Sequence, residues 1–122
     1  MPRLYRSIIL VSDIEQAQAF YSTVLGMPGK RVSPERHYFD CEGTILACFD
    51  SMKFNEKPAT PNPDYVYIAV DDLNESYALC KQAGATITEE IQSHPWGETS
   101  FYIEDPFGNP MCFVDRTTVF MG

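Results

Sequence analysis

The sequence predicts an α+β fold in which two βαβββ modules form a curved mixed sheet around a concave pocket. Three observations predict this fold. Residues 9–14 recur as residues 68–73, an offset of 59, and each copy leads into a helical pattern. Residues 40–43 and 105–108 form a second pair, at an offset of 65, and each precedes a strand pattern. A proline-rich stretch separates the two halves.

The first module is expected over residues 4–50. A strand comes first, and then apolar residues recur at spacings of three and four, which is typical of a helix face. Ser12 and Glu15 have the spacing of a capping box, so Ser12 is the predicted N-cap. Gly26 is expected to end the helix, because the residue after a helix often adopts a positive φ. A meander of three strands follows.

The second module, residues 64–115, repeats this pattern. Its helix is expected to be capped by Asp71 or Asp72 and to end at Gly84. Between the modules, residues 51–63 contain three prolines and little periodic apolar character, which predicts a linker. All 122 residues are expected to form one domain.

Composition narrows the classes of partner. The chain has 9 Lys and Arg against 17 Asp and Glu, a net charge of −8, so neither nucleic acid nor an anionic membrane is expected to bind. No stretch approaches the roughly 18 apolar residues of a membrane span, and the first residues do not form a signal peptide, so a cytoplasmic protein is expected. The four cysteines lack metal-site spacing, which favours free thiols. The tail, residues 116–122, either covers a neighbouring apolar surface or frays.

Several short motifs resemble those of the vicinal oxygen chelate superfamily, which includes glyoxalase I, bleomycin- and fosfomycin-resistance proteins and ring-cleaving dioxygenases. These motifs lie at residues 11–14, 20–21, 25–27, 95–97 and 105–109. The resemblance covers nearly the whole chain and implies a glyoxalase/bleomycin-resistance-like fold. It says less about activity, since this scaffold hosts several chemistries.

The resemblance also implies where a metal would bind. Metal-dependent members place one ligand on the first strand and one on the fourth strand of each module. In this sequence those four positions are Arg6, Ala47, Tyr65 and Cys112. None is His or Glu, the ligands that a divalent metal prefers in such a site, so no metal cofactor is expected. A metal elsewhere would need His37 or His94, and no spacing motif supplies their partners.

Strand alternation predicts which side chains line the pocket. Arg6 is expected to point into it, while Ile9 and Val11 face the helix. The expected cup is aromatic and mostly apolar, with an arginine and no carboxylate, which is typical of a small-molecule site. The candidate ligand-binding residues are Arg6, Phe49, Tyr65, Tyr67, Trp96 and Cys112.

Each candidate has a structural alternative. Arg6 would instead form an ion pair, Tyr65 and Tyr67 would only pack, Trp96 would anchor a loop over the pocket, and Cys112 would be an inert buried thiol.

Two functions stay open at this stage. The first is a metal-independent small-molecule-binding protein, resembling the bleomycin-resistance branch, in which a homodimer sequesters an aromatic or drug-like compound. The alternative is a lyase or dioxygenase of the same superfamily with a non-standard site, whose catalytic residues the sequence does not identify. A third possibility is a domain whose ligand is a partner protein.

Overall fold

Each half of the chain folds as a compact unit built on one four-stranded sheet. The computed structural model describes residues 1–122, divided into unit 1 (Met1–Asn62) and unit 2 (Pro63–Gly122). Unit 1 contains β1 (Arg6–Val11), α1 (Ile14–Leu25), β2 (Lys30–Ser33), β3 (Arg36–Cys41), β4 (Thr44–Asp50) and α2 (Ser51–Asn55). Unit 2 contains β5 (Val66–Val70), α3 (Leu73–Gln82), β6 (Thr86–Ser93), β7 (Thr99–Glu104), β8 (Pro110–Asp115) and a short 3-10 helix, Arg116–Thr118. The predicted α+β class with two βαβββ modules is confirmed.

The two sheets have the same topology. Their strand orders are β1-β4-β3-β2 and β5-β8-β7-β6, and in each the first strand runs parallel to the last while the other pairs are antiparallel. Val11 pairs with Asp50 in unit 1, and Val70 pairs with Asp115 in unit 2. These pairs preserve both sequence offsets, 59 and 65, so the sequence repeat corresponds to a repeat in strand register.

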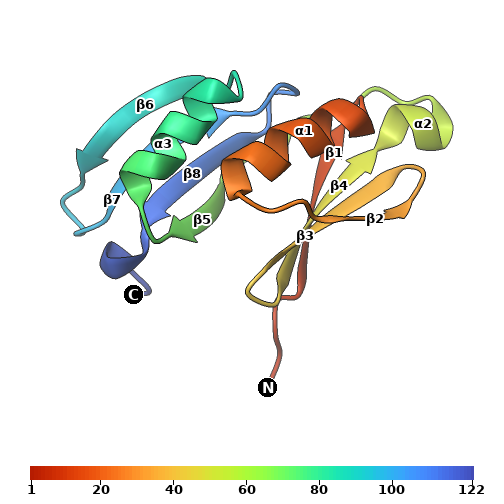
Figure 1. Ribbon diagram of the computed structural model, residues 1–122. Coiled ribbons are helices and arrows are strands. Elements are labelled where there is room, and N and C mark those ends of the chain that lie inside the picture. Colours follow the sequence, from red (N-terminus) through yellow and green to blue (C-terminus); the bar gives the residue numbers. More distant parts are fainter. The chain divides into compact units, whose positions relative to one another are not determined.

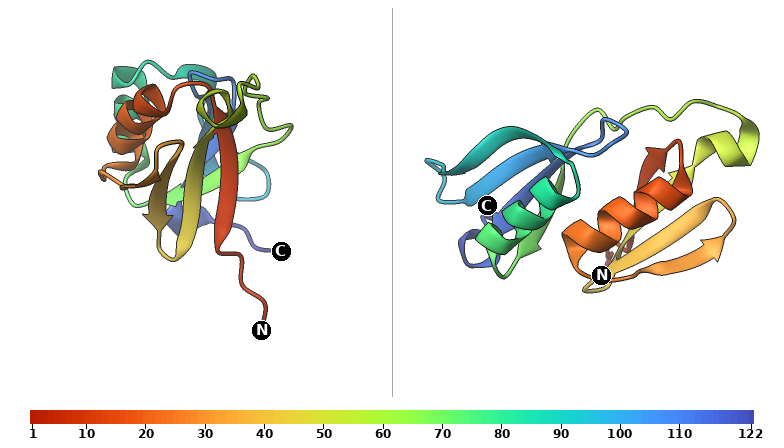
Figure 2. Two further views of the ribbon diagram at one scale, coloured as in Figure 1. Left: turned by 90° about the vertical axis from the view of Figure 1, so that its right-hand side faces the viewer. Right: turned by 45° about the horizontal axis from the view of Figure 1, so that its top comes forward.

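One helix covers one face of each sheet. Figures 1 and 2 show α1 lying across the sheet of unit 1 and α3 lying across the sheet of unit 2. The core forms at these two contacts, where alternate strand residues are apolar: Ile9 and Phe39 are fully buried in unit 1, and Phe101 and Phe113 in unit 2. The opposite face of each sheet, which neither α1 nor α3 covers, is called its open face below.

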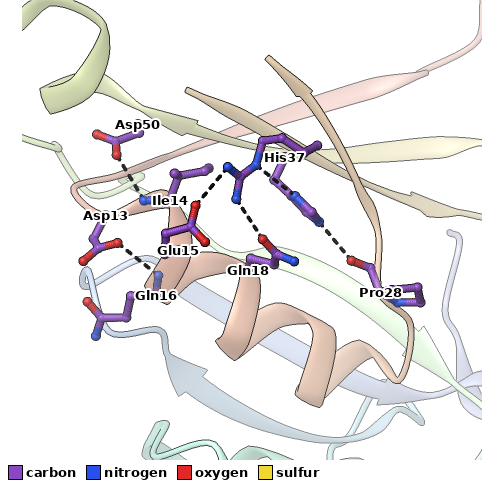
Figure 3. Close-up of polar contacts among 9 residues, drawn as sticks. Asp13, Ile14, Glu15, Gln16, Gln18, Pro28, His37 and Asp50 are labelled. Atoms are coloured by element: carbon purple, nitrogen blue, oxygen red, sulfur yellow. Dashed lines mark hydrogen bonds and ion pairs between the residues drawn. The ribbon is translucent and has the colours of Figure 1, made fainter. Parts of the chain in front are cut away.

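Both long helices begin at an aspartate. The predicted N-cap Ser12 is wrong: the structure places Asp13 there, and its Oδ1 accepts from the Gln16 N–H at 3.1 Å (Figure 3). In unit 2 the cap is Asp72, one of the two predicted residues, and Glu75 N–H donates to it. Ser and Asp both cap helices well, so the sequence alone does not decide between the adjacent residues Ser12 and Asp13.

The predicted linker is not entirely irregular. Its first part forms α2, which follows β4 directly (Figure 2). Asp50 caps this helix by accepting from the Lys53 N–H at 2.9 Å, and Glu56 ends it at a φ of 60°. Residues 57–62 then lead to the boundary between the units, at Asn62 and Pro63. No helix in the structure combines the length and the apolar character needed to span a membrane.

Candidate functional site

Aromatic rings and arginines occupy the open face of unit 1. Ile8 is paired with Ala47, and Ala47 with Tyr38, in one row across three strands. Ala47 is buried at the centre of this row between two larger side chains. The next row places Phe49 beside Arg36, and Arg6 lies at the start of β1 on the same face. Small residues at the centre and large ones around them give this face its shape.

The two arginines lie on aromatic rings. The Arg6 Cζ is 5.3 Å from the centroid of the Tyr5 ring and 5.2 Å from that of Tyr38. The Arg36 Cζ is 4.4 Å from the Phe49 centroid, and its Nη1 donates to the Tyr38 hydroxyl at 3.4 Å. A guanidinium over a ring is attracted by the negative charge of the ring face. Arg6 is therefore held by cation–π contacts, and not by the ion pair that the structural alternative required.

Tyrosines dominate the open face of unit 2. Tyr67 is paired with Cys112, and Cys112 with Tyr102, so the two tyrosines flank the cysteine. The Tyr65 ring lies 5.0 Å from Tyr102 and 6.5 Å from Tyr67, in edge-to-face contacts. Tyr65 and Tyr67 keep 42% and 56% of their surface exposed. Rings that pack against each other and still face solvent offer a preformed surface to a ligand.

Cys112 is buried beneath these tyrosines. Burial raises the pKa of its thiol, and hydrogen bonds with Ser100 and Tyr102 offset this only in part. Burial also raises the pKa of the Tyr102 hydroxyl, and a hydrogen bond with Tyr67 adds to the rise. Both groups thus stay protonated near neutral pH. This agrees with an inert buried cysteine, because a nucleophilic cysteine needs a lowered pKa.

A stacked pair extends the aromatic surface of unit 2. The rings of His94 and Trp96 lie 4.5 Å apart and almost parallel, with an interplanar angle of 8°. His94 also contacts Tyr102 edge-to-face at 6.2 Å, and its Nε2 hydrogen-bonds Ser100 Oγ at 3.1 Å. Trp96, 48% exposed, donates from Nε1 to Glu98 Oε1 at 2.8 Å. The loop indole is therefore fixed against the tyrosine cluster.

Comparison with known proteins identifies the fold family. Residues 4–113 match the family model described as Glyoxalase/Bleomycin resistance protein/Dioxygenase superfamily. The chain belongs to this superfamily. It is similar to the protein YwbC of Bacillus subtilis (strain 168), described as uncharacterized, with 29% identity over 93% of this chain and 98% of that protein.

Solved structures agree with this assignment. A glyoxalase/bleomycin resistance protein from Albidiferax ferrireducens aligns with a TM-score of 0.79 and 22% identity, covering 92% of this chain and 98% of that one. A glyoxalase-related enzyme from Fulvimarina pelagi aligns with a TM-score of 0.79 and 18% identity, covering 100% of this chain and 94% of that one. At these identities the likeness establishes the fold alone.

The residues at the superfamily's metal-ligand positions do not fit a divalent metal. Ala47 has no donor atom, Arg6 carries a fixed positive charge, and the Cys112 thiol is held protonated. Tyr65 offers a phenol oxygen, which is not among the imidazole, carboxylate and thiolate ligands that such a metal prefers.

The histidines do not supply an alternative metal centre. His37 is only 2% exposed; its Nε2 donates to the Pro28 carbonyl at 2.9 Å, and its Nδ1 accepts from Arg31 Nε at 3.3 Å (Figure 3). Both ring nitrogens are thereby occupied. His94 Nε2 lies 3.7 Å from Glu89 Oε2, yet no group of three or more His, Cys, Asp or Glu side chains is arranged to hold a metal.

The six predicted ligand-binding residues separate into two groups. Arg6 and Phe49 lie on the open face of unit 1, whereas Tyr65, Tyr67, Trp96 and Cys112 belong to unit 2. Sequence reasoning missed the partners that complete each group: Arg36 and Tyr38 in unit 1, and His94 and Tyr102 in unit 2. Strand alternation could have revealed three of them, since His37, Phe39, Phe101 and Ile103 are the buried neighbours of Arg36, Tyr38 and Tyr102.

The expectation of a cup without carboxylates is wrong for unit 2. Glu89 and Glu98 lie close enough to act electrostatically on Cys112, and each raises the pKa of its thiol. Glu89 reaches this face from β6 and Glu98 from the loop before β7. Adjacent acidic residues in a strand point to opposite sides, and Glu90 accordingly accepts from the Tyr77 hydroxyl on α3.

Proposed function

We propose that this member of the superfamily is a metal-independent small-molecule-binding protein that sequesters an aromatic or drug-like compound. The observation that carries the proposal is the cluster of five rings on the open face of unit 2: Tyr65, Tyr67, His94, Trp96 and Tyr102. Aromatic side chains supply large contact areas with little loss of conformational entropy. Their mutual contacts fix the rings before a ligand arrives, which lowers the cost of binding.

The raised pKa values of Cys112 and Tyr102 favour a binding role for these two side chains. A group that transfers protons in catalysis needs a pKa near the working pH, and burial moves both groups away from it. The side chains at the superfamily's metal positions support a metal-independent site, because they are a guanidinium, a methyl group, a phenol and a thiol whose pKa is raised.

Trp96 provides a direct test. It is the only tryptophan, so the 15N-labelled protein has one indole N–H signal. We expect titration with 2-naphthamide, a neutral planar aromatic probe, to shift this signal saturably together with amides of β5, β7 and β8. Tyr67→Ala and Trp96→Ala are each expected to weaken binding by about fivefold or more, since base-like rings stacked on aromatic side chains contribute about 1 kcal/mol or more.

Tyr67→Phe is the matched control. It keeps the ring and removes only the hydroxyl, so its affinity is expected to stay within about twofold of the parent. The proposal fails if 2-naphthamide produces no saturable shift in unit 2, or if Tyr67→Ala and Trp96→Ala both bind as the parent does.

We further propose that the protein is a homodimer and acts in the cytoplasm; the second point rests on the sequence alone. The dimer is supported by apolar side chains in the tail, where Phe120 is 58% and Met121 is 92% exposed. The Phe120 N–H donates to Glu98 Oε2 at 3.0 Å, which ties this tail to the residue that also holds Trp96. Light scattering at micromolar concentration tests the dimer, and a monomer mass would refute it.

A further inference from the structure

Two arginines on the open face of unit 1 have no carboxylate partner. Arg31 and Arg116 each have one: Arg31 Nη1 lies 3.0 Å from Glu15 Oε1, and Arg116 Nε lies 2.8 Å from Asp71 Oδ1. Arg6, which is exposed, and Arg36, which is half-buried, form no ion pair and contact only aromatic rings and a hydroxyl. Their positive charge is therefore available to something outside the chain.

Both guanidinium groups lie on the same side chain, Tyr38. Arg6 sits over its ring at 5.2 Å, and Arg36 Nη1 reaches its hydroxyl oxygen at 3.4 Å. Two like charges gathered around one ring repel each other, and an anion between them would remove that repulsion. Each guanidinium has five N–H donors in one plane, and stacking on a ring leaves the edge free. Arg36 uses one of its donors on Tyr38.

The surroundings add positive charge and apolar surface. Lys30 on β2 is paired with Tyr38 and forms no ion pair. Asp40 is the acidic strand residue on this face. Its Oδ1 accepts from the Gly43 N–H at 2.7 Å in the β3–β4 turn, and it forms no ion pair with Arg6 or Arg36. Phe49, beneath Arg36, contacts Phe54 of α2 at 5.1 Å, and Ile8 is 44% exposed. Cationic edges thus border an apolar floor.

We propose that the open face of unit 1 binds a small aromatic carboxylate, with the carboxylate on Arg6 and Arg36 and the ring on the apolar side chains beside them. This inference rests on the proposed function, that the protein binds a small aromatic molecule, and it extends that function by naming the class of ligand for the open face of unit 1. The planar fork of a guanidinium matches the two oxygens of a carboxylate, and such paired hydrogen bonds are about twice as strong as neutral ones.

The test compares two probes that share one ring system. 2-Naphthoate carries a carboxylate where 2-naphthamide carries a neutral amide. At the amides of β1 and β3, 2-naphthoate is expected to bind about tenfold more tightly than 2-naphthamide, and added salt is expected to weaken it. Arg6→Gln and Arg36→Gln are each expected to weaken the binding of 2-naphthoate by about fivefold or more. Arg36→Lys keeps the charge but loses the planar fork, so it is expected to weaken binding by less than Arg36→Gln.

Lys57→Gln is the control, because it removes the same charge from unit 1 in the segment after α2; its affinity should stay within about twofold of the parent. Equal affinities for the two probes at unit 1, or equal losses in Lys57→Gln and the arginine variants, would overturn the inference. The proposed function is tested by the Trp96 indole signal in unit 2, which these results do not involve, so the two proposals can fail independently. The inference about unit 1 would also be overturned if inorganic phosphate competed as strongly as 2-naphthoate, since the site would then select phosphate.

Discussion

The two units share a fold and differ in what their open faces present. Unit 1 contains seven Lys and Arg and seven Asp and Glu, so it is neutral; unit 2 contains two Lys and Arg and ten Asp and Glu, so it carries the whole net charge of −8. The cationic open face of unit 1 has Arg6 and Arg36, and the acidic unit 2 has a tyrosine cluster with Glu89 and Glu98 nearby.

This difference shows that the repeat conserves backbone register while leaving chemistry free to diverge. Ile8 with Ala47 and Tyr67 with Cys112 are equivalent pairs in the two sheets, yet only the second pair places a hydroxyl and a thiol on the open face. The net charge of the chain describes unit 2 and gives no indication of the arginines in unit 1. Ligand chemistry has to be inferred one face at a time.

Asp50 and Asp115 are equivalent in the repeat, and substituting them is expected to give the largest difference in stability between the two units. Asp50 is 3% exposed, and its Oδ2 accepts from the Ile14 N–H at 3.0 Å (Figure 3). Its Oδ1 accepts from the Lys53 N–H, so one carboxylate caps α2 and also holds the first residue of α1. Asp50→Ala is expected to lower the free energy of unfolding by about 3 kcal/mol, because buried donors lose a charged acceptor. Chemical denaturation measures the loss.

Asp115→Ala supplies the comparison. The Asp115 carboxylate accepts from the N–H and the hydroxyl of Thr117, in the short 3-10 helix, and those bonds lower the pKa of its carboxyl. A clearly smaller loss of stability is expected. Equal losses for the two variants would mean that Asp50 does not couple α1 to α2 as described.

Gly29 and Gly84 give the second contrast. Both have positive φ, 64° and 83°, but a Cβ on Gly29 would come within 2.7 Å of His37 and Phe39, whereas a Cβ on Gly84 meets nothing within 4 Å. Gly84→Ala is expected to cost about 1 kcal/mol from backbone strain. Gly29→Ala is expected to cost about 2 to 3 kcal/mol, since overpacking adds to the strain. Thermal melts of both variants check the difference.

Alkaline pH should destabilise the protein, with a contribution from the core of unit 2. Burial raises the pKa of Cys80 from its ordinary 9.0 to about 12. Above pH 9 the unfolded chain therefore loses this proton while the folded chain keeps it, so stability falls as pH rises from 9 toward 12. Cys80→Ala is expected to reduce that slope by at most about 1.4 kcal/mol per pH unit. An unchanged slope, in denaturation across this pH range, would contradict the assignment.

The helix caps give the smallest expected effects and the same effect in both units. Asp13→Ala and Asp72→Ala should each cost about 1 kcal/mol, because each removes the acceptor for a backbone N–H in the first turn. Ser12→Ala should cost less than about 0.5 kcal/mol, since Ser12 precedes the cap. A larger loss for Ser12→Ala than for Asp13→Ala would restore the capping box expected from the sequence.

Much of the fold could be predicted because it depends on periodicity. The offsets of 59 and 65 fixed equivalent positions, and the alternation in β1 correctly separated buried Ile9 and Val11 from exposed Arg6 and Ile8. The short helix α2 escaped prediction because the prolines after it dominate its segment, and its cap, Asp50, is also the end of a strand.

The candidate sites were harder to predict, because their members come from strands and loops with no fixed sequence spacing. His94 joins Trp96 to Tyr102 only through ring contacts that depend on the loop between β6 and β7. Arg36 and Arg6 meet at Tyr38 because β4 lies between β1 and β3, a strand order that leaves no local pattern. Alternation assigns a side chain to a face, and only the tertiary fold assigns its neighbours.

The central claim is that this superfamily fold binds an aromatic molecule here without a metal. The most direct measurement combines elemental analysis of the purified protein with titration of 2-naphthamide, followed at the Trp96 indole signal, before and after exhaustive chelation. The account predicts far less than one Zn, Ni, Fe or Mn per chain and the same affinity in both titrations. About one such metal per chain, with binding lost on chelation, would contradict it.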